Sequence, residues 1–153
     1  MTHELLNGLS SGEVERILAL GTRQIIPAGA SLFRLGDSAD RLFLTERGRI
    51  RLTLPMQVRG REENILVEER SPGQTVGWSA LIPPYRFTLT ATAPLETEVI
   101  ALPREGLREY FAACPEAGYK VALNLAVVVG HRLQLFQTMW VREMQRTVEV
   151  RSA

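Results

Sequence analysis

The hydrophobic and polar positions of the chain follow three patterns in succession. Near the amino terminus, Ser10 and Glu13 have the spacing of a capping box, and a short apolar helical face follows and ends before Gly21. From about residue 24 to residue 102, short apolar runs alternate with turn residues. After residue 104, apolar residues recur at spacings of three and four, which predicts helices.

The middle region reads as a series of short strands. In its clearest segment, Ile50, Leu52 and Leu54 alternate with polar residues, directly after a turn at Gly48. This alternation is typical of a strand with one buried face. A hairpin is expected to turn near Gly60. About eight short strands at this spacing predict a β-sandwich, a jelly roll or a small barrel.

The last third is predicted to be helical. One helix covers REGLREYFAAC and ends at Pro115, and a longer one runs from about residue 116 to residue 146. The long helix carries two apolar lines: Leu125, Val129, Leu133, Phe136, Trp140 and Met144 form the first, and Val121, Val128, Leu135 and Met139 form the second. One line is enough to lie on a sheet, so the second predicts another partner, most simply the same helix of a second copy. The alternative is one broad face buried within its own domain.

Composition narrows the function classes. The chain has 153 residues, 45% of them hydrophobic and 23% charged, with a net charge of +1, as in an ordinary single domain. This balance gives no reason to expect a nucleic-acid or membrane partner. A single cysteine excludes an internal disulfide and a CxxC pair. The amino terminus has no export signal, so a cytoplasmic location is expected.

Residues 76–93, VGWSALIPPYRFTLTATA, hold the most informative motif. A glycine lets the backbone come close to a ligand, and a short helix after it presents unpaired N–H groups to an anion. An arginine follows between two aromatic residues, and a guanidinium is well suited to bind a phosphate. The segment has the parts of a small anion pocket, although a tight turn with a surface arginine would have the same composition.

Five turn motifs occur in a characteristic order. They are IPAG at 26–29, Gly36-Asp37 before an apolar strand, Arg47-Gly48-Arg49, PGQTVG at 72–77 and ALPRE at 101–105. In this order, over nearly the whole chain, they resemble the cyclic nucleotide-binding domain of the cAMP receptor protein (Crp/Fnr) family. The resemblance implies a mainly β jelly roll, or double-stranded β-helix, in one domain over residues 1–153. Residues 1–22 would hold a short N-terminal helix, 23–103 the β-roll with the phosphate cassette at 76–93, and 104–147 the C-terminal helices.

The resemblance also implies a ligand site. The cassette positions are Gly77, Trp78, Ser79, Ala80, Tyr85, Arg86, Phe87 and Thr88, and the candidate lid contacts on the long helix are Arg132, Leu133 and Phe136. The family has glutamate directly after the cassette glycine, where this chain has Trp78. Tryptophan can stack or fill space, but it cannot accept a hydrogen bond from a ribose hydroxyl.

The position of the family's phosphate arginine is ambiguous. Counted back from Ala93 it falls on Phe87, counted forward from Gly77 it falls on Thr88, and Arg86 lies beside both. A slip of one residue turns a strand side chain to the opposite face. Either Arg86 enters the pocket, or it faces solvent and Phe87 fills the pocket.

These features predict a small-molecule sensor or regulatory domain that signals through a dimerising C-terminal helix. Its effector would be a cyclic nucleotide or another small anion, and cAMP itself is in doubt. The alternatives are a ligand-free interaction module with a protein partner, favoured if Trp78 and Phe87 fill the pocket, and the sensor fragment of a longer transcription regulator.

Other classes are not expected. The only histidines, His3 and His131, have no metal-ligand spacing, so neither a metal site nor an enzyme is predicted. No recognition helix follows the long helix, so this chain alone should not bind nucleic acid.

Overall fold

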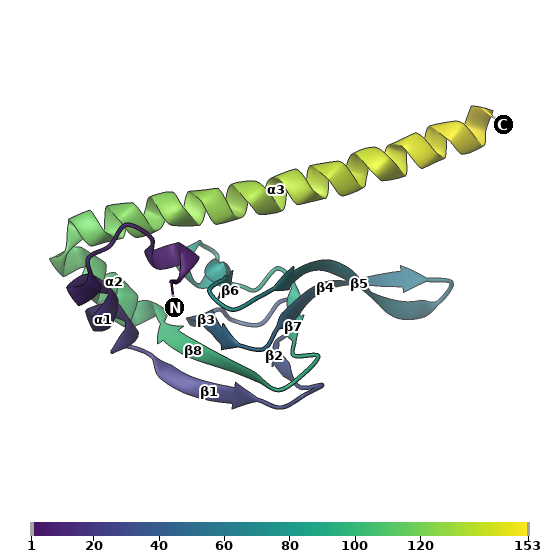
Figure 1. The fold of residues 1–153 in the computed structure, drawn as a ribbon. Coiled ribbons are helices and arrows are strands. Elements are labelled where there is room, and N and C mark those ends of the chain that lie inside the picture. Colours follow the sequence, from purple (N-terminus) through teal and green to yellow (C-terminus); the bar gives the residue numbers. More distant parts are fainter. Residues whose placement is uncertain (1, 153) are drawn as a thin grey trace.

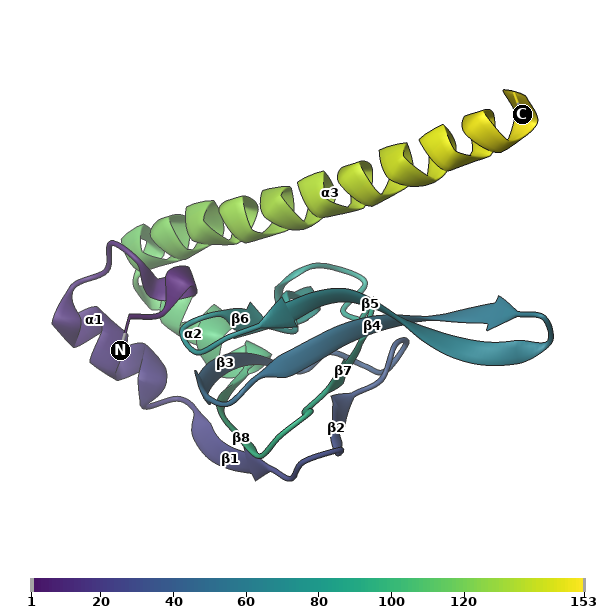
Figure 2. The ribbon, with the colours of Figure 1, turned by 45° about the vertical axis from the view of Figure 1, so that its right-hand side comes forward.

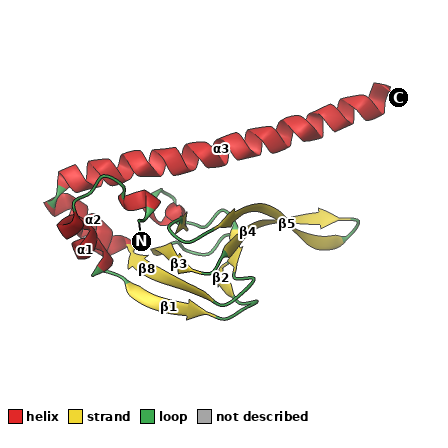
Figure 3. Cartoon of the chain, in the orientation of Figure 1, coloured by secondary structure: helices red, strands yellow, loops and turns green. Residues whose placement is uncertain are grey.

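The computed structural model describes residues 2–152, in which a β-roll lies between short N-terminal helices and one long C-terminal helix (Figures 1 and 3). This is the jelly-roll architecture that the strand pattern and the turn motifs predicted. The elements in chain order are the 3-10 helix η1 (Glu4–Leu6), α1 (Ser11–Leu18), β1 (Thr22–Ile26), β2 (Ser31–Phe33), β3 (Arg41–Arg47), β4 (Ile50–Val58), β5 (Arg61–Arg70), β6 (Thr75–Val76), the 3-10 helix η2 (Trp78–Leu81), β7 (Thr90–Thr92), β8 (Thr97–Pro103), α2 (Arg104–Ala113) and α3 (Pro115–Ser152).

The eight strands form two antiparallel four-stranded sheets. One has the order β1-β8-β3-β6 and the other β2-β7-β4-β5. Strand β4 shows how the sequence directs the packing, because Ile50 and Leu52 are buried between the sheets while Arg51 between them is exposed. The β4–β5 hairpin turns at Arg59 and Gly60 and projects beyond the roll (Figure 2).

The predicted capping box is present at the start of α1. The Glu13 backbone N–H donates to Ser10 Oγ over 3.2 Å, and the Ser10 N–H donates to the Glu13 carboxylate over 3.1 Å. These two bonds satisfy N–H groups that an uncapped helix would leave without partners. Ile17 is fully buried, so the short helix is fixed against the core.

Helix α3 is the longest element and extends beyond the roll (Figure 1). Its 38 residues span about 57 Å at about 1.5 Å per residue. The helix begins at Pro115 as expected but continues to Ser152 rather than ending near residue 146, because the last residues contain neither glycine nor proline. Ala117, Val121, Val128 and Arg132 are the buried residues of this helix.

Candidate functional site

The cassette begins with a left-handed turn between β6 and η2. Gly77 has φ of 78°, a conformation that favours glycine. A Cβ at this position would lie 3.0 Å from Phe87 Cε1 and 3.3 Å from Phe33 Cε2. Glycine is therefore required both by the turn and by the close approach of two aromatic rings.

Those two rings fill the space beside the cassette. The ring centroids of Phe33 and Phe87 are 3.7 Å apart, with an angle of 9° between the ring planes. The cavity that remains has a volume of ≈ 20 Å³, which is room for about one water molecule. Its lining residues are Phe33, Leu52, Gly77, Trp78, Ser79, Phe87, Thr88, Leu89 and Arg132.

The structure places Phe87, and not Arg86, against this cavity. Phe87 is 6% exposed. Arg86 is exposed and donates from Nη1 to the carbonyl oxygen of Gly36 over 3.0 Å. A β-bridge pairs Arg86 with Ser38 and fixes this register. Of the two registers that the sequence left open, the chain adopts the one in which the arginine faces solvent.

The remaining cassette positions divide into two groups. Trp78, Ser79 and Thr88 line the small cavity, and Ala80 is fully buried beside them in η2. Tyr85 is not among the lining residues. Its ring lies under the Arg104 guanidinium, with 4.3 Å from the guanidinium carbon to the ring centroid.

Only one of the three predicted lid residues reaches the cavity. Arg132 is 8% exposed and its guanidinium carbon lies 5.6 Å from the centroid of the Trp78 ring, within cation–π range. Leu133 and Phe136 are exposed and do not line the cavity. Helix α3 therefore closes the cassette with a charged side chain rather than with an apolar one.

Arg132 belongs to a chain of alternating charges. Its Nε donates to Glu68 Oε2 over 2.6 Å, and the other oxygen of Glu68 accepts from Arg70 Nη1 over 2.7 Å. Arg70 also pairs with Glu4, and its Nε donates to the carbonyl oxygen of Thr75 over 3.1 Å. The same Glu4 carboxylate accepts the Thr75 backbone N–H over 2.9 Å. The chain of charges joins α3, β5 and the N-terminal segment.

Burial and pairing act on Arg132 in opposite directions. Loss of hydration lowers the pKa of Arg132 below its ordinary value, whereas the charge and hydrogen bond of Glu68 raise it. A buried arginine is tolerated when a carboxylate pairs with it and its donors are used. The Glu68 carboxylate supplies the paired charge and accepts from Arg132 Nε.

Comparison with known proteins decides the family. A family model described as "Cyclic nucleotide-binding domain" matches residues 23–114, more than half of the chain. The chain belongs to this family.

Relatives of this cyclic nucleotide-binding domain include the cyclic AMP receptor protein of Thermus thermophilus, 30% identical over 130 residues that cover 85% of this chain and 57% of the relative. The crystal structure of the Thermus thermophilus catabolite activator protein superposes with a TM-score of 0.71 at 28% identity, covering 97% of this chain and 63% of that one. This chain thus spans less than two thirds of the length of either.

A third similar protein has nearly the same length as this domain. It is a putative cyclic nucleotide-binding protein of Geobacter metallireducens, whose structure superposes with a TM-score of 0.70 at 25% identity. The superposition covers 86% of this chain and 92% of the other. The fold is therefore also found in a solved chain of similar extent.

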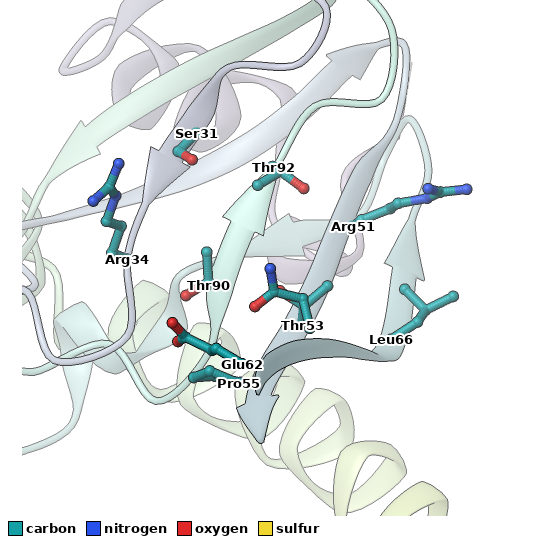
Figure 4. A pocket seen from close by; sticks show the side chains of 10 residues that line it. Ser31, Arg34, Arg51, Thr53, Pro55, Glu62, Leu66, Thr90 and Thr92 are labelled. Atoms are coloured by element: carbon teal, nitrogen blue, oxygen red, sulfur yellow. The ribbon is translucent and has the colours of Figure 1, made fainter. Parts of the chain in front are cut away.

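A much larger cavity lies outside the cassette, on the outer face of the β2-β7-β4-β5 sheet (Figure 4). Its volume is ≈ 620 Å³, and it is lined by Ser31, Arg34, Arg51, Thr53, Pro55, Glu62, Asn64, Leu66, Thr90 and Thr92. In Figure 4 the Arg51 side chain points away from the threonines, and Arg51 Nε already pairs with Glu69 over 3.1 Å. Polar residues of this kind are usual on the solvent face of an antiparallel sheet.

The structure also bears on metal binding and on membrane insertion. Within residues 2–152, no three His, Cys, Asp or Glu side chains come together as metal ligands would. In the same described part of the chain, no helix combines the length and the apolar character needed to cross a bilayer.

The residues that sequence reasoning missed are Phe33, Glu68, Arg70 and Glu4. Phe33 lies 54 positions before its stacking partner, and Arg132 lies 64 positions after Glu68. The one local signal was the spacing of Glu68 and Arg70, which are two residues apart and would share a face of an extended strand. That signal indicates a charged pair but does not identify its partner on α3.

Proposed function

We propose that this domain is a regulatory module that transmits its output through a dimerising α3, and that its own side chains close the cassette against cyclic nucleotides. The observation that carries the proposal is the stacked pair of Phe33 and Phe87, which leaves ≈ 20 Å³ where a ligand would bind. Ligand pockets for small molecules occupy roughly 300–1,000 Å³.

The chemistry of the cassette supports the same conclusion. Trp78 stands where the family has a glutamate that accepts from the ribose, and Arg86 faces away from the cavity. Both charged groups that would recognise a cyclic nucleotide are thus absent from the pocket. The Thermus thermophilus relative is named for cyclic AMP, and we do not extend that ligand to this chain.

The cost of opening the pocket also bears on affinity. A ligand would have to displace Phe33 or Phe87, and exposing a buried phenylalanine costs roughly 1.5–3 kcal/mol. Since about 1.4 kcal/mol corresponds to a tenfold change in affinity, this requirement alone would weaken binding by about 10- to 150-fold.

The output element of the proposal is the exposed line on α3. Leu133, Phe136, Trp140, Met144 and Val148 are exposed and follow one another at spacings of three and four. An uncovered apolar line of this length is typical of a helix that packs against another helix. We assign it to the α3 helix of a second copy, so that the regulatory module is a homodimer. The proposal includes neither catalysis nor DNA binding by these residues.

A second function is favoured by one observation. Arg132 holds a guanidinium at the cavity beside Trp78, and an arginine over an aromatic ring is able to bind a small anion that carries a flat group. The domain would then be a sensor for an effector other than cAMP, and binding would have to separate Arg132 from Glu68.

The test is a thermal-unfolding titration of the purified chain with cAMP, cGMP and cyclic di-GMP. Ligand at a hundred times its dissociation constant would add roughly 2.7 kcal/mol, or about 5–10 °C in the midpoint for a chain of this size. We expect no saturable shift for the wild type. A saturable shift with any of the three would contradict the closed cassette. A shift with cGMP or cyclic di-GMP but not with cAMP, lost in Arg132→Ala and kept in Arg86→Ala, would support the second function.

A matched variant tests the reason for closure. The double substitution Trp78→Glu and Phe87→Arg restores the two charged groups and removes one ring of the stack. We expect this variant to gain a midpoint shift with cAMP. If it folds and gains none, the two replaced groups are not what excludes the nucleotide.

A further inference from the structure

We propose that the Arg132–Glu68 ion pair is a separable latch that holds α3 over the mouth of the cassette, and that its opening frees the helix beyond Gly130 while Glu68 stays bonded to Arg70 within the β-roll. The inference deepens the proposed function and rests on it in one respect, that α3 is the output element. It concerns how α3 is held and does not require any ligand to bind.

The latch is separable because the two oxygens of the Glu68 carboxylate bind two different arginines. One oxygen accepts from Arg132 Nε over 2.6 Å, and the other accepts from Arg70 Nη1 over 2.7 Å. When α3 lifts, Glu68 therefore keeps a charged partner within the roll. Arg70 in turn keeps Glu4 and the Thr75 carbonyl oxygen.

When the pair separates, Glu68 stays in the β-roll and Arg132 moves into water, so the two charges have different surroundings. Breaking a buried ion pair is costly when it leaves an unpaired charge in the interior. On the roll side Glu68 keeps its bond to Arg70, and two carboxylates then share one guanidinium. The negative charge that is left lies on the side chains of Glu4 and Glu68, which are 31% and 21% exposed to water. On the helix side Arg132 passes from a buried position to water and regains the hydration that burial removed. The partial exposure of these two carboxylates thus reduces the free-energy cost of separating the pair.

The latch also forms part of the cassette. The Arg132 guanidinium lies over Trp78, the first residue of η2, and lines the small cavity together with Phe33 and Phe87. Lifting Arg132 therefore removes one wall of the cavity and uncovers the Trp78 ring. The Arg132 side chain therefore couples the position of the helix to the state of the cassette, one turn before Leu135, which also packs against the core.

The start of α3 is anchored independently of the latch. Val121 and Val128 are buried, and Asn124 Nδ2 donates to the carbonyl oxygens of Leu5 and Asn7 over 2.9 and 2.8 Å. Gly130 lies between this anchor and Arg132, and a Cβ at Gly130 would meet nothing within 4 Å. Glycine inside a helix lowers the local helical stability. The chain therefore has a weak point directly before the latch.

The experiment uses the full chain and two local readouts. The chain has two tryptophans, so a Trp140→Phe background leaves Trp78 as the only fluorescent tryptophan. Acrylamide quenching then reports the exposure of Trp78, and amide hydrogen exchange reports the protection of residues 131–139, 121–128 and 66–75. Glu68→Gln removes the charge of the latch while keeping its size, and Arg132→Met removes the guanidinium. Arg142→Met, an exposed arginine on the same helix, is the matched control.

We expect both latch variants to increase the quenching of Trp78 and to raise exchange in residues 131–139 by about tenfold, the effect of one charge-assisted hydrogen bond. Residues 121–128 and 66–75 should keep their protection, and Arg142→Met should resemble the parent. Equal loss of protection in all three segments would overturn the proposal, because the pair would then be a general stabiliser. Unchanged quenching and exchange in both variants would overturn it as well.

These outcomes are independent of the ligand titration. A wild type that binds a cyclic nucleotide would contradict the closed cassette without affecting the latch readouts. A latch that fails these tests would leave the titration result unchanged. Glu68→Gln is the milder of the two substitutions, so the proposal stays testable if Arg132→Met does not fold.

Discussion

The two halves of α3 are similar in apolar content but differ in what lies beneath them. In the first half, residues 115–132, Val121 and Val128 are buried on the roll and Arg132 is paired at the cassette. In the second half, residues 133–152, the aromatic side chain of Trp140 is 65% exposed. Figure 1 shows the reason, because α3 slants away from the β-roll toward its C-terminal end. Leu135 is the exception near the start of this half, since it packs against the core.

This difference separates two roles for apolar residues on one helix. Those over the roll contribute to the stability of the single chain, since folding removes them from water. Those beyond the roll contribute nothing to it until a partner covers them. Substitutions in the first half should therefore change the free energy of unfolding of the single chain, and substitutions in the second half should change its association.

The largest effect is expected from a charge placed under the first half. Val121→Asp would bury a carboxylate without a partner and lower the free energy of unfolding by about 3 kcal/mol or more. Urea unfolding at a concentration where the chain is monomeric measures this change. Leu123→Asp, at a position that is 51% exposed on the same turn of the helix, should cost about 1 kcal/mol or less. Equal losses in the two variants would contradict the assignment of the buried face.

A charge in the second half should act on association instead. Trp140→Glu is expected to raise the dissociation constant of the proposed dimer by about 30-fold, as loss of a central aromatic residue typically costs 2 kcal/mol or more. Sedimentation equilibrium measures the constant, and urea unfolding of the monomer should change little. Arg142→Ala, about half a turn round the helix from Trp140, is the control and should leave association intact. A wild type that stays monomeric at micromolar concentration would contradict the dimer.

The smallest effect lies at the junction of the two halves. Gly130→Ala should stabilise the chain by roughly 0.5–1 kcal/mol, because the new methyl group meets open space and alanine favours the helix. Gly118→Ala is the matched control, since its Cβ would lie 3.0 Å from Phe111 Cβ and the crowding should cancel the gain. Thermal unfolding of both variants measures the difference. A gain at Gly118 as large as at Gly130 would show that packing does not distinguish them.

Local features of the fold could be predicted from sequence because their causes are local. The Ser10–Glu13 capping box depends on two residues three apart, and it is present as expected. The alternation of Ile50 and Leu52 with Arg51 determines which face of β4 is buried. Each of these signals is contained within a few residues of the element it specifies.

The cassette contents could not be predicted because they depend on contacts between distant segments. The choice between Arg86 and Phe87 is made by the bridge to Ser38 in another loop. The charge that closes the cavity comes from Arg132, whose partner on β5 is 64 positions away. The two apolar lines of α3 were visible, but which one meets the roll depends on where the strands end. The hydrophobic pattern of a sequence shows which faces of a helix or strand are apolar. It does not show which other segment packs against each face.

The reach of α3 has a mechanical consequence. The 20 residues after Arg132 extend about 30 Å at about 1.5 Å per residue. A small rotation of α3 at the cassette is therefore magnified at the C-terminal end of the helix. A tilt of about 10° at Arg132 would move the far end by about 5 Å, close to one helical turn of about 5.4 Å. A rearrangement the size of a single side chain at the cassette would then reach a partner at the far end as a sideways displacement of about 5 Å.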